Sequence, residues 1–361
     1  MNAVTPITGL RVREAGAGDE ARIAAFLREH AGATPFHRPE WSKAVEQGCS
    51  QKSHTLIAEA TGLPLPFRGE GWGEGAVVGL LPLTHVTSPL FGSALVSAGF
   101  GIGGGILAAT EAAAEELATA AINLAQTLNT PSVELRGGHL PRTWQHTTGT
   151  YANFARDLPA SDDAILKSIP RKQRAEVRRA QTLGLTVRTG TSEQDRAAHY
   201  RVYSESVRNL GTPVFPRALF DAMLDQFGVD ADILTVSKDG HPIASVLTLY
   251  DKGTAYPYWG GGTTGARALR ANEHMYFELM RHAARRGCTR FDFGRSKFGT
   301  GAFAFKKNWG FEPQPLTYAV HGEARETNPM SPKYRLQVAL WKKLPLWAAN
   351  RLGPPIARGL G

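Results

Sequence analysis

The chain has 361 residues, of which 42% are hydrophobic and 20% charged, a composition typical of a folded protein of about two domains. Its two cysteines, Cys49 and Cys288, lie far apart and form no CxxC pair, which argues against a metal site or a disulfide framework. The start lacks a basic region followed by an apolar one, and no apolar run is long enough to span a membrane. We therefore expect a cytoplasmic protein, and its net charge of +9 favours anionic partners.

Strands and helices alternate along the first half. Strands are expected at 10–15, 53–60, 76–88 and 131–138, helices at 21–32 and 110–129, a turn leading into a short helix at 33–41, and a glycine-rich strand end at 99–105. The second half repeats this order, with strands at 185–190, 232–250, 254–263 and 289–295 and helices at 193–211, 211–228 and 269–288. Within 232–250, Asp239-Gly240 predicts a two-residue hairpin turn.

Matching landmarks indicate that the two halves are a duplication. The spacing from Gly103 to Gly260 nearly equals the spacing from Glu134 to Asp292, and both glycines begin a run of three. Extra residues in the first half, at about 62–76, are rich in proline and glycine and predict a hairpin loop insert. Chance recurrence of α/β patterns is the alternative to duplication.

The repeated order of elements is that of the acyltransferase fold called GNAT. In that fold the fourth and fifth strands splay apart, the acyl group of the donor enters between them, and its anionic part sits at the N-terminus of the next helix. The sequence thus predicts an α/β (α+β) protein with two tandem GNAT-like domains, each a mixed sheet flanked by helices. We place a degenerate domain at 1–158, a catalytic domain at 159–325 and a basic tail with an amphipathic helix at 326–361.

The segment TRFDFGRSKFGTGAFAFKKNWGFEPQPL resembles the closing motif of the Fem family of peptidyltransferases. The segment RKQRAEVRRAQTLGLTV resembles the basic helix of that family, and YSESVRNLGTPVFP, DADILTV, RALRAN and LGPPIARGLG are similar to its exosortase/PEP-CTERM-associated members. The resemblance implies two GNAT-like domains and transfer of an acyl or aminoacyl group to an amine or hydroxyl. It leaves acyl-CoA and aminoacyl-tRNA open as donors.

Three residues of the second half are candidates for catalysis. Lys306 lies among aromatic residues that include Phe305 and Trp309, and can contact a phosphate or a developing oxyanion, although it can equally be a lysine snorkelling over an aromatic core. Asp292 can act as a general base, or can be a buried carboxylate paired with Arg295 or a backbone N–H group. Tyr258 can act as an acid, or can form a wall of the core.

Residues at the start of the long helix of the second half are candidates for donor binding. The glycine run and the polar side chains after it suit a pyrophosphate, and surface placement is the alternative. The set comprises Trp259, Gly260, Gly261, Gly262, Arg267 and Asn272, with Arg295, Phe305 and Trp309 from the closing motif.

Two basic segments predict contacts with anions. Arg171, Arg174 and Arg178 form one stripe of a helix, which fits tRNA or a pyrophosphate-linked lipid, or is a solvated face. The tail alternates apolar residues with cations and has no acidic residue after Glu326, as in a helix that lies at a membrane interface or, alternatively, one packed on the domains. We expect removal of the residues after Lys333 to affect location and not folding.

The sequence thus predicts an acyl- or aminoacyltransferase acting on a lipid-linked saccharide or other anionic precursor of the cell envelope or of an exopolysaccharide. tRNA and the inner face of the membrane are further candidate partners. The alternative is a non-catalytic protein on a GNAT-like scaffold that binds nucleic acid or anionic lipid through its charges.

Overall fold

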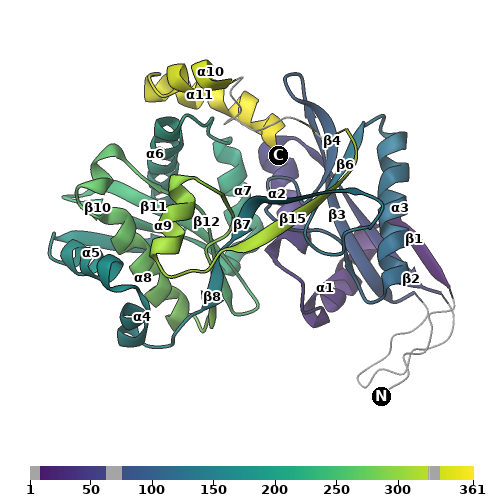
Figure 1. Ribbon diagram of the computed structural model, residues 1–361, viewed down its shortest axis with the longest axis horizontal. Helices are drawn as coiled ribbons and strands as arrows, with labels where there is room; N and C mark the ends of the chain where they lie inside the picture. The colour runs from purple at the N-terminus through teal and green to yellow at the C-terminus, as the bar shows by residue number, and fades with distance from the viewer. Residues whose placement is uncertain (1–8, 62–74, 324, 326–333) are drawn as a thin grey trace.

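The computed structural model describes residues 9–61, 75–323, 325 and 334–361, and most of the expected insert at 62–76 lies outside this part of the chain. Two mixed β-sheets lie side by side, each with helices packed against it (Figure 1). No helix of the described residues is long and apolar enough to cross a membrane.

The first sheet has the strand order β1-β2-β3-β4-β6-β15-β7-β14, with β5 pairing β3. Its strands are β1 (Leu10–Glu14), β2 (Lys52–Ala60), β3 (Val77–Ser88), β4 (Gly92–Ser97), β5 (Leu107–Ala108), β6 (Ser132–Arg136), β7 (Gln145–Asn153), β14 (Ser296–Lys297) and β15 (Gln314–Gly322). Side chains alternate between its faces. Leu56 and Ala58 pack in the cluster with helix α3 (Glu111–Thr127), whereas Ile57 packs in the cluster with α1 (Glu20–Glu29).

The second sheet has the order β8-β13-β12-β11-β10-β9. Its strands are β8 (Ala155–Asp157), β9 (Leu185–Gly190), β10 (Ala231–Lys238), β11 (His241–Asp251), β12 (Thr254–Gly262) and β13 (Arg290–Asp292). Its helices are α4 (Asp162–Ser168), α5 (Arg171–Gln181), α6 (Glu193–Leu210), α7 (Arg217–Phe227) and α8 (Ala271–Arg285). The predicted turn joins β10 to β11, with both Asp239 and Gly240 at positive φ.

The predicted duplication is confirmed by the order of the strands. β1-β2-β3-β4-β6 and β9-β10-β11-β12-β13 are each antiparallel until the last pair, which is parallel. In both halves a long helix, α3 or α8, connects the strands of the parallel pair. β4 ends at Ser97, so the glycine-rich segment 99–105 follows this strand rather than ending it.

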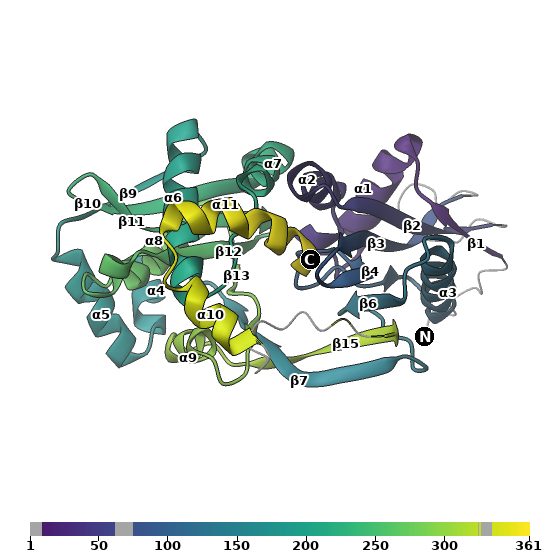
Figure 2. The same cartoon turned by 90° about the horizontal axis from the view of Figure 1, so that it is seen from above.

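The two halves also exchange strands. β15 comes from the range expected for the second domain, yet it lies between β6 and β7 in the first sheet. β8 comes from the range expected for the first domain, yet it pairs with β13 in the second sheet. Strand β15 runs between the halves in both views (Figures 1 and 2). Each sheet is therefore completed by residues from the other side of the boundary expected near residue 158.

An apolar core joins the halves where helix α2 (Pro39–Cys49) packs against α7. A Cβ atom at Gly48 would overlap the backbone of Leu219, so only glycine permits this approach of the two helices. Trp41 is fully buried and stacks on Trp259 with ring centroids 5.9 Å apart. The halves thus share a hydrophobic interior, which fixes the position of any site between them.

The C-terminal tail forms two helices, α10 (Arg335–Trp341) and α11 (Leu346–Ala357), that pack on both halves (Figure 2). Val338 contacts Gly211 at the end of α6, and Ala357 is fully buried. The carbonyl oxygen of Gly361 accepts hydrogen bonds from Arg136 and Arg325, each 3.2 Å long. This packing matches the alternative of a tail helix packed on the domains, and it predicts that removal of the tail would expose buried apolar surface of both halves.

Candidate active site

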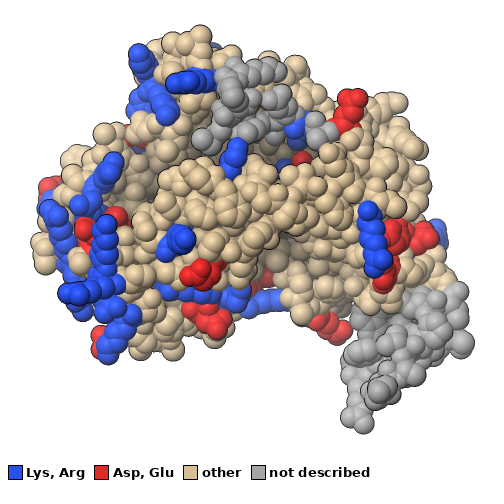
Figure 3. All heavy atoms as spheres, viewed as in Figure 1, with Lys and Arg blue, Asp and Glu red and all other residues tan. Residues whose placement is uncertain are grey.

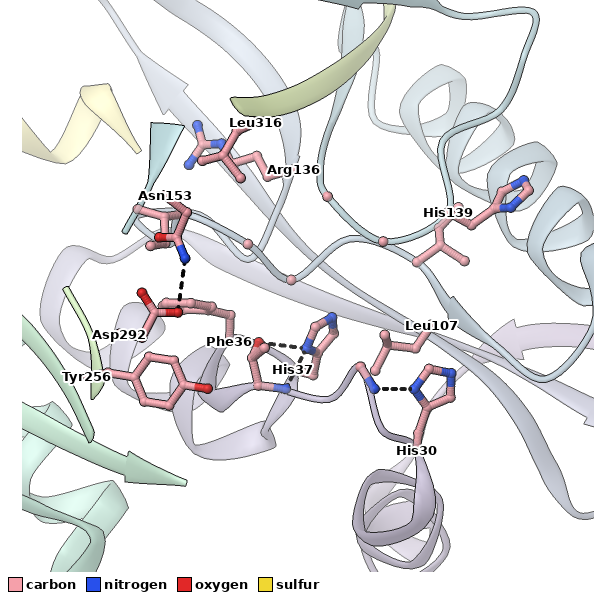
Figure 4. Close-up of a pocket in the computed structure, with 18 of the residues that line it drawn as sticks. His30, Phe36, His37, Leu107, Arg136, His139, Asn153, Tyr256, Asp292 and Leu316 are labelled. Atoms are coloured by element: carbon pink, nitrogen blue, oxygen red, sulfur yellow. Dashed lines mark hydrogen bonds between the residues drawn. The ribbon is translucent and has the colours of Figure 1, made fainter. Parts of the chain in front are cut away.

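A cavity of about 420 Å³ lies at the junction of the two halves (Figure 4). The first half supplies the turn around His37, the glycine-rich segment after β4 and the end of β6, and the second half supplies Tyr256 and Asp292. Strand β7 of the first sheet adds Asn153, and the exchanged strand β15 adds Leu316. The cavity is therefore built from both halves and from the strands that cross between them.

The divergence of β4 from β6 creates this space. The two strands pair in parallel only at Leu95 and Val96, and the chain then turns away through residues 99–105. A Cβ atom at Gly105 would overlap the carbonyl of Gly137, so glycine is required where the two segments meet again. This opening occurs at the strand pair where the GNAT resemblance implied a splay.

His37 anchors one wall of the cavity. Its Nε2–H donates to the carbonyl of Gly105 at 3.0 Å, and its Nδ1 accepts from the N–H and hydroxyl groups of Thr34. Burial lowers the pKa of His37 to about 4, so the ring is neutral near pH 7. A neutral ring with both nitrogens engaged positions the wall and has no proton available for transfer.

Asp292 presents a carboxylate to the cavity from the end of β13. Its Oδ1 accepts the backbone N–H of Gly294 at 2.8 Å, and its Oδ2 accepts the side-chain amide of Asn153 at 3.1 Å. Of the partners left open by the sequence, the structure thus shows the backbone N–H group and not Arg295. Burial raises the pKa of Asp292, and the neighbouring Tyr256 also has a raised pKa, through its own burial and then the charge of Asp292. A half-buried carboxylate of raised basicity at a cavity wall is suited to accept a proton.

Lys306 hydrogen-bonds to the turn that follows Asp292. It lies on α9 (Gly301–Asn308), and its Nζ donates to the carbonyls of Gly294 at 3.0 Å and Arg295 at 2.9 Å. Its Nζ also lies 5.7 Å and 5.8 Å from the ring centroids of Phe154 and Phe293. Burial lowers the pKa of Lys306 to about 7, so its charge is adjustable near neutral pH. The adjacent Lys307 is exposed.

The glycine run of the second half has a different environment. Gly260, Gly261 and Gly262 remain in β12, paired with residues 244–246 of β11. Cβ atoms there would contact Tyr276, Ser206 and Asn272 respectively. The ring of Tyr276 also lies 4.7 Å from that of Phe293, which follows β13. Aromatic side chains therefore occupy the space between β12 and β13, the expected position of the donor.

Other predicted donor residues lie around the start of α8. Arg267 is exposed, and the Oδ1 atom of Asn272 is buried without a hydrogen-bond partner. Arg295 donates to the hydroxyl of Tyr318 at 2.8 Å, and its guanidinium lies 4.5 Å from the ring centroid of Tyr151. These residues do not line the cavity that contains Asp292.

The aromatic candidates either pack in the hydrophobic core or join the two halves. Trp259 and Trp309 are 3% and 0% exposed, so both pack the interior and cannot contact a ligand directly. Phe305 is partly buried and packs on Tyr276. The hydroxyl of Tyr258 donates to the carbonyl of Phe100 at 2.8 Å, and its burial raises its pKa, so it joins the halves and is a poor acid.

The basic stripe is only partly free. Arg174 donates to the carbonyls of Lys167 and Ile169 and so caps the end of the preceding helix. Arg171 and Arg178 are exposed, and cations cluster over α5 at the left of Figure 3. The stripe therefore offers two outward cations and one that is engaged with the backbone.

Sequence reasoning missed the contribution of the first half to the cavity. Arg136, which lines it, follows Glu134 by two residues on β6, and its Nε donates to Glu134 at 2.7 Å. The only available signal was the pair Gly137-Gly138 directly after this strand. Asn153 could not have been identified, because its role depends on a strand that crosses between the halves.

Comparison with known proteins identifies the fold and a domain. Residues 168–307 match the family model described as an acetyltransferase (GNAT) domain. Over 79 residues the chain is 29% identical to the lipid II:glycine glycyltransferase of Staphylococcus epidermidis. This alignment covers 20% of this chain and 19% of that protein. The chain thus spans about a fifth of the length of the curated relatives that it matches.

Solved structures extend the likeness to most of the chain. The crystal structure of FemX superposes with a TM-score of 0.62 at 15% identity, covering 85% of this chain and 96% of FemX. A tandem GNAT protein from the clavulanic acid biosynthesis pathway gives a TM-score of 0.53 at 12% identity, covering 87% and 98%. The chain therefore has the predicted tandem GNAT fold, and its residues 168–307 form a transferase domain of the GNAT type.

Proposed function

We propose that the protein transfers an acyl or aminoacyl group to an amine or hydroxyl that enters the cavity between its halves. The observation that carries the proposal is Asp292, a carboxylate of raised pKa that faces the cavity and has only neutral hydrogen-bond partners, Asn153 and the N–H of Gly294. The GNAT domain match supports transfer chemistry, and this geometry supports the location of the proton acceptor.

In the proposed mechanism the acceptor nucleophile attacks the carbonyl carbon of the donor while Asp292 accepts its proton. Negative charge then develops on the carbonyl oxygen, and when the carbonyl re-forms, the bond to the donor breaks and the CoA thiol or the tRNA hydroxyl leaves with the proton that Asp292 accepted. Lys306 fixes the carbonyls of Gly294 and Arg295 and thereby the turn that holds Asp292, and in its charged form it adds positive potential at this end of the cavity. The glycines bordering the cavity allow close approach of a ligand to the main chain.

For the donor we propose an acyl-CoA thioester, supported by the GNAT domain match. Aminoacyl-tRNA, implied by the resemblance to the Fem family, is the competing donor, and the exposed Arg171 and Arg178 are the cations that would contact it. Release of a free thiol or of deacylated tRNA distinguishes the two.

For the acceptor we propose a lipid-linked saccharide precursor of the cell envelope or of an exopolysaccharide. The name of the glycyltransferase relative, which includes lipid II, and the resemblance to exosortase/PEP-CTERM-associated proteins support this class. Such an acceptor would bring the enzyme from the cytoplasm to the inner face of the membrane.

The alternative function is binding without catalysis, favoured by the exposed cations of α5 (Figure 3). A pure binder would need those charges and not Asp292, and its affinity would fall steeply with salt.

Native mass spectrometry of the purified protein tests the proposal first, because a co-purified acyl-CoA or lipid-linked saccharide would identify the reactants. A transfer assay with the identified pair should then show loss of turnover in Asp292→Asn, with folding intact. Unchanged turnover in that variant would contradict the role of Asp292.

A further inference from the structure

The outer face of the C-terminal tail exposes large apolar side chains. Leu336 and Leu340 are 70% and 59% exposed on α10, and Trp347 and Leu352 are 73% and 51% exposed on α11. This exposure follows from the inward packing of the tail, since Val338 contacts Gly211 and Gly353 contacts Val214. Each helix thus carries apolar side chains on its exposed side as well as on the side that packs against the described chain.

Two further exposed apolar side chains lie on segments that the tail contacts. Leu210 is 69% exposed next to Gly211, and Leu90 is 67% exposed beside Phe91, which lies against Gly359. Six of the nine large apolar side chains that are exposed in the described chain therefore gather at or beside the tail. Both helices lie at the top of the molecule in Figure 1 and face the viewer in Figure 2.

The same surface is positively charged. Arg335, Lys342, Lys343 and Arg351 are exposed, and the sequence has no acidic residue after Glu326. Cations lie over these helices at the top of Figure 3. A second copy of the chain would bring like charges together across a two-fold interface, which disfavours self-association through this face.

We propose that this tail face, comprising Leu336, Leu340, Trp347 and Leu352 with the four exposed cations, docks the protein on an anionic lipid bilayer. Tryptophan and leucine insert at the boundary of headgroups and acyl chains, and cations beside them are attracted to anionic headgroups. The inference deepens the proposed function, because docking would bring the cavity to a lipid-linked acceptor.

Co-sedimentation with vesicles tests this surface without any substrate. The wild-type chain should bind phosphatidylglycerol vesicles and bind phosphatidylcholine vesicles far more weakly. Lys342→Gln combined with Lys343→Gln should reduce the partition coefficient about 30-fold at low salt, roughly fivefold for each cation. Leu340→Ser combined with Trp347→Ser should reduce it at least about tenfold, since less apolar surface is inserted.

Matched controls separate a specific face from net charge and general hydrophobicity. Arg11→Gln with Lys52→Gln removes the same charge from strands β1 and β2, and Val187→Ser with Val229→Ser removes exposed apolar side chains elsewhere. Both controls should bind vesicles nearly as the wild type does, and circular dichroism should show all variants folded.

Equal binding to both lipids, or a loss in the controls as large as in the tail variants, would overturn the proposal. A dimer in sedimentation velocity that Trp347→Ser dissociates would assign the face to a second copy instead. Vesicle binding without transfer activity would leave the docking face standing and count against the proposed function alone.

Discussion

The two halves have the same strand order, yet the space between their fourth and fifth strands differs. In the first half the space beyond β4 and β6 opens into the cavity, whereas in the second half Tyr276 and Phe293 occupy the space between β12 and β13. The first turn of α3 presents the short buried side chains of Ala113 and Ala114, whereas the ring of Tyr276 on α8 reaches β12. One topology thus supports an open cavity in one half and a packed interior in the other.

The acids at matching positions in the two halves, Glu134 and Asp292, differ in their hydrogen-bond partners and in the direction of their pKa shifts. Glu134 on β6 is paired with Arg136, and this pairing, with further arginines nearby, lowers its pKa despite burial. Asp292 on β13 has neutral partners, and burial raises its pKa. A carboxylate satisfied by an arginine is structural, whereas one kept without a cation partner is available for chemistry. In the proposed active site, the acid of the second half thus faces a cavity that the first half largely lines.

The largest effect expected is on catalysis, from the lysine that holds the turn at Asp292. Lys306→Ala should lower transfer by at least about 100-fold, because it removes both the support of Gly294 and a positive charge near the developing oxyanion. Lys307→Ala, which removes an exposed cation from the adjacent position, is the matched control and should be nearly neutral. Equal turnover in the two variants would show that Lys306 is only a core lysine.

The aromatic packing between β12 and β13 of the second half should be essential for stability. Tyr276→Ala should lower the free energy of unfolding by about 3 kcal/mol, because it leaves a void between β12 and Phe293. Tyr276→Phe keeps the ring and should cost less than about 1 kcal/mol. Denaturant unfolding measures both. If Tyr276→Ala instead retained stability and altered donor affinity, the space would be a donor channel that the ring gates.

Replacing each of the two acids by its neutral amide should change the stability of the protein in opposite directions. Glu134→Gln should destabilise the protein at pH 7 by about 2 kcal/mol, because it breaks a charge-assisted hydrogen bond to a buried arginine. The contribution of Glu134 is present above pH 4.5 and lost as the pH falls through its lowered pKa.

Asp292→Asn should instead be neutral or gain up to about 1 kcal/mol at pH 7, because the raised pKa means that ionisation of Asp292 costs stability as the pH rises. The substituted amide can donate to the Oδ1 of Asn153, which now has no hydrogen-bond partner, after Asn153 rotates. Thermal melts of both variants at pH 5 and pH 7 check the opposite signs. Destabilisation by Asp292→Asn comparable to that of Glu134→Gln would indicate that both acids are structural.

A pH dependence of stability is also expected from Lys306. Because its folded pKa of about 7 lies below the ordinary value of 10.5, the unfolded chain binds more protons between these values. Stability should therefore rise with pH from 7 towards 10.5 in the wild type relative to Lys306→Met. Parallel stability curves for the two proteins would mean that the lysine stays charged in the fold.

The sequence by itself determined the order of elements, the duplication and the closeness of Asp292 to Lys306. Periodicity, glycine runs and the Asp239-Gly240 turn are local signals, and Asp292 and Lys306 meet through a single short turn around Gly294. The tertiary structure decided which aromatic residues face the cavity. Strand β12 shifts register between the pairs Leu247–Trp259 and Thr248–Pro257, which interrupts the alternation of side chains along the strand at Tyr258.

Only the tertiary structure could reveal the exchange of β8 and β15 and the role of Asn153, because pairing between segments far apart in the chain leaves no periodic signal in either one. It likewise decided that Trp259 and Trp309 are core residues, since an aromatic side chain has the same sequence pattern whether its neighbours are protein or ligand. The cavity depends on both kinds of information. Local glycines permit the strands to part, and the packing of two halves determines which space remains open.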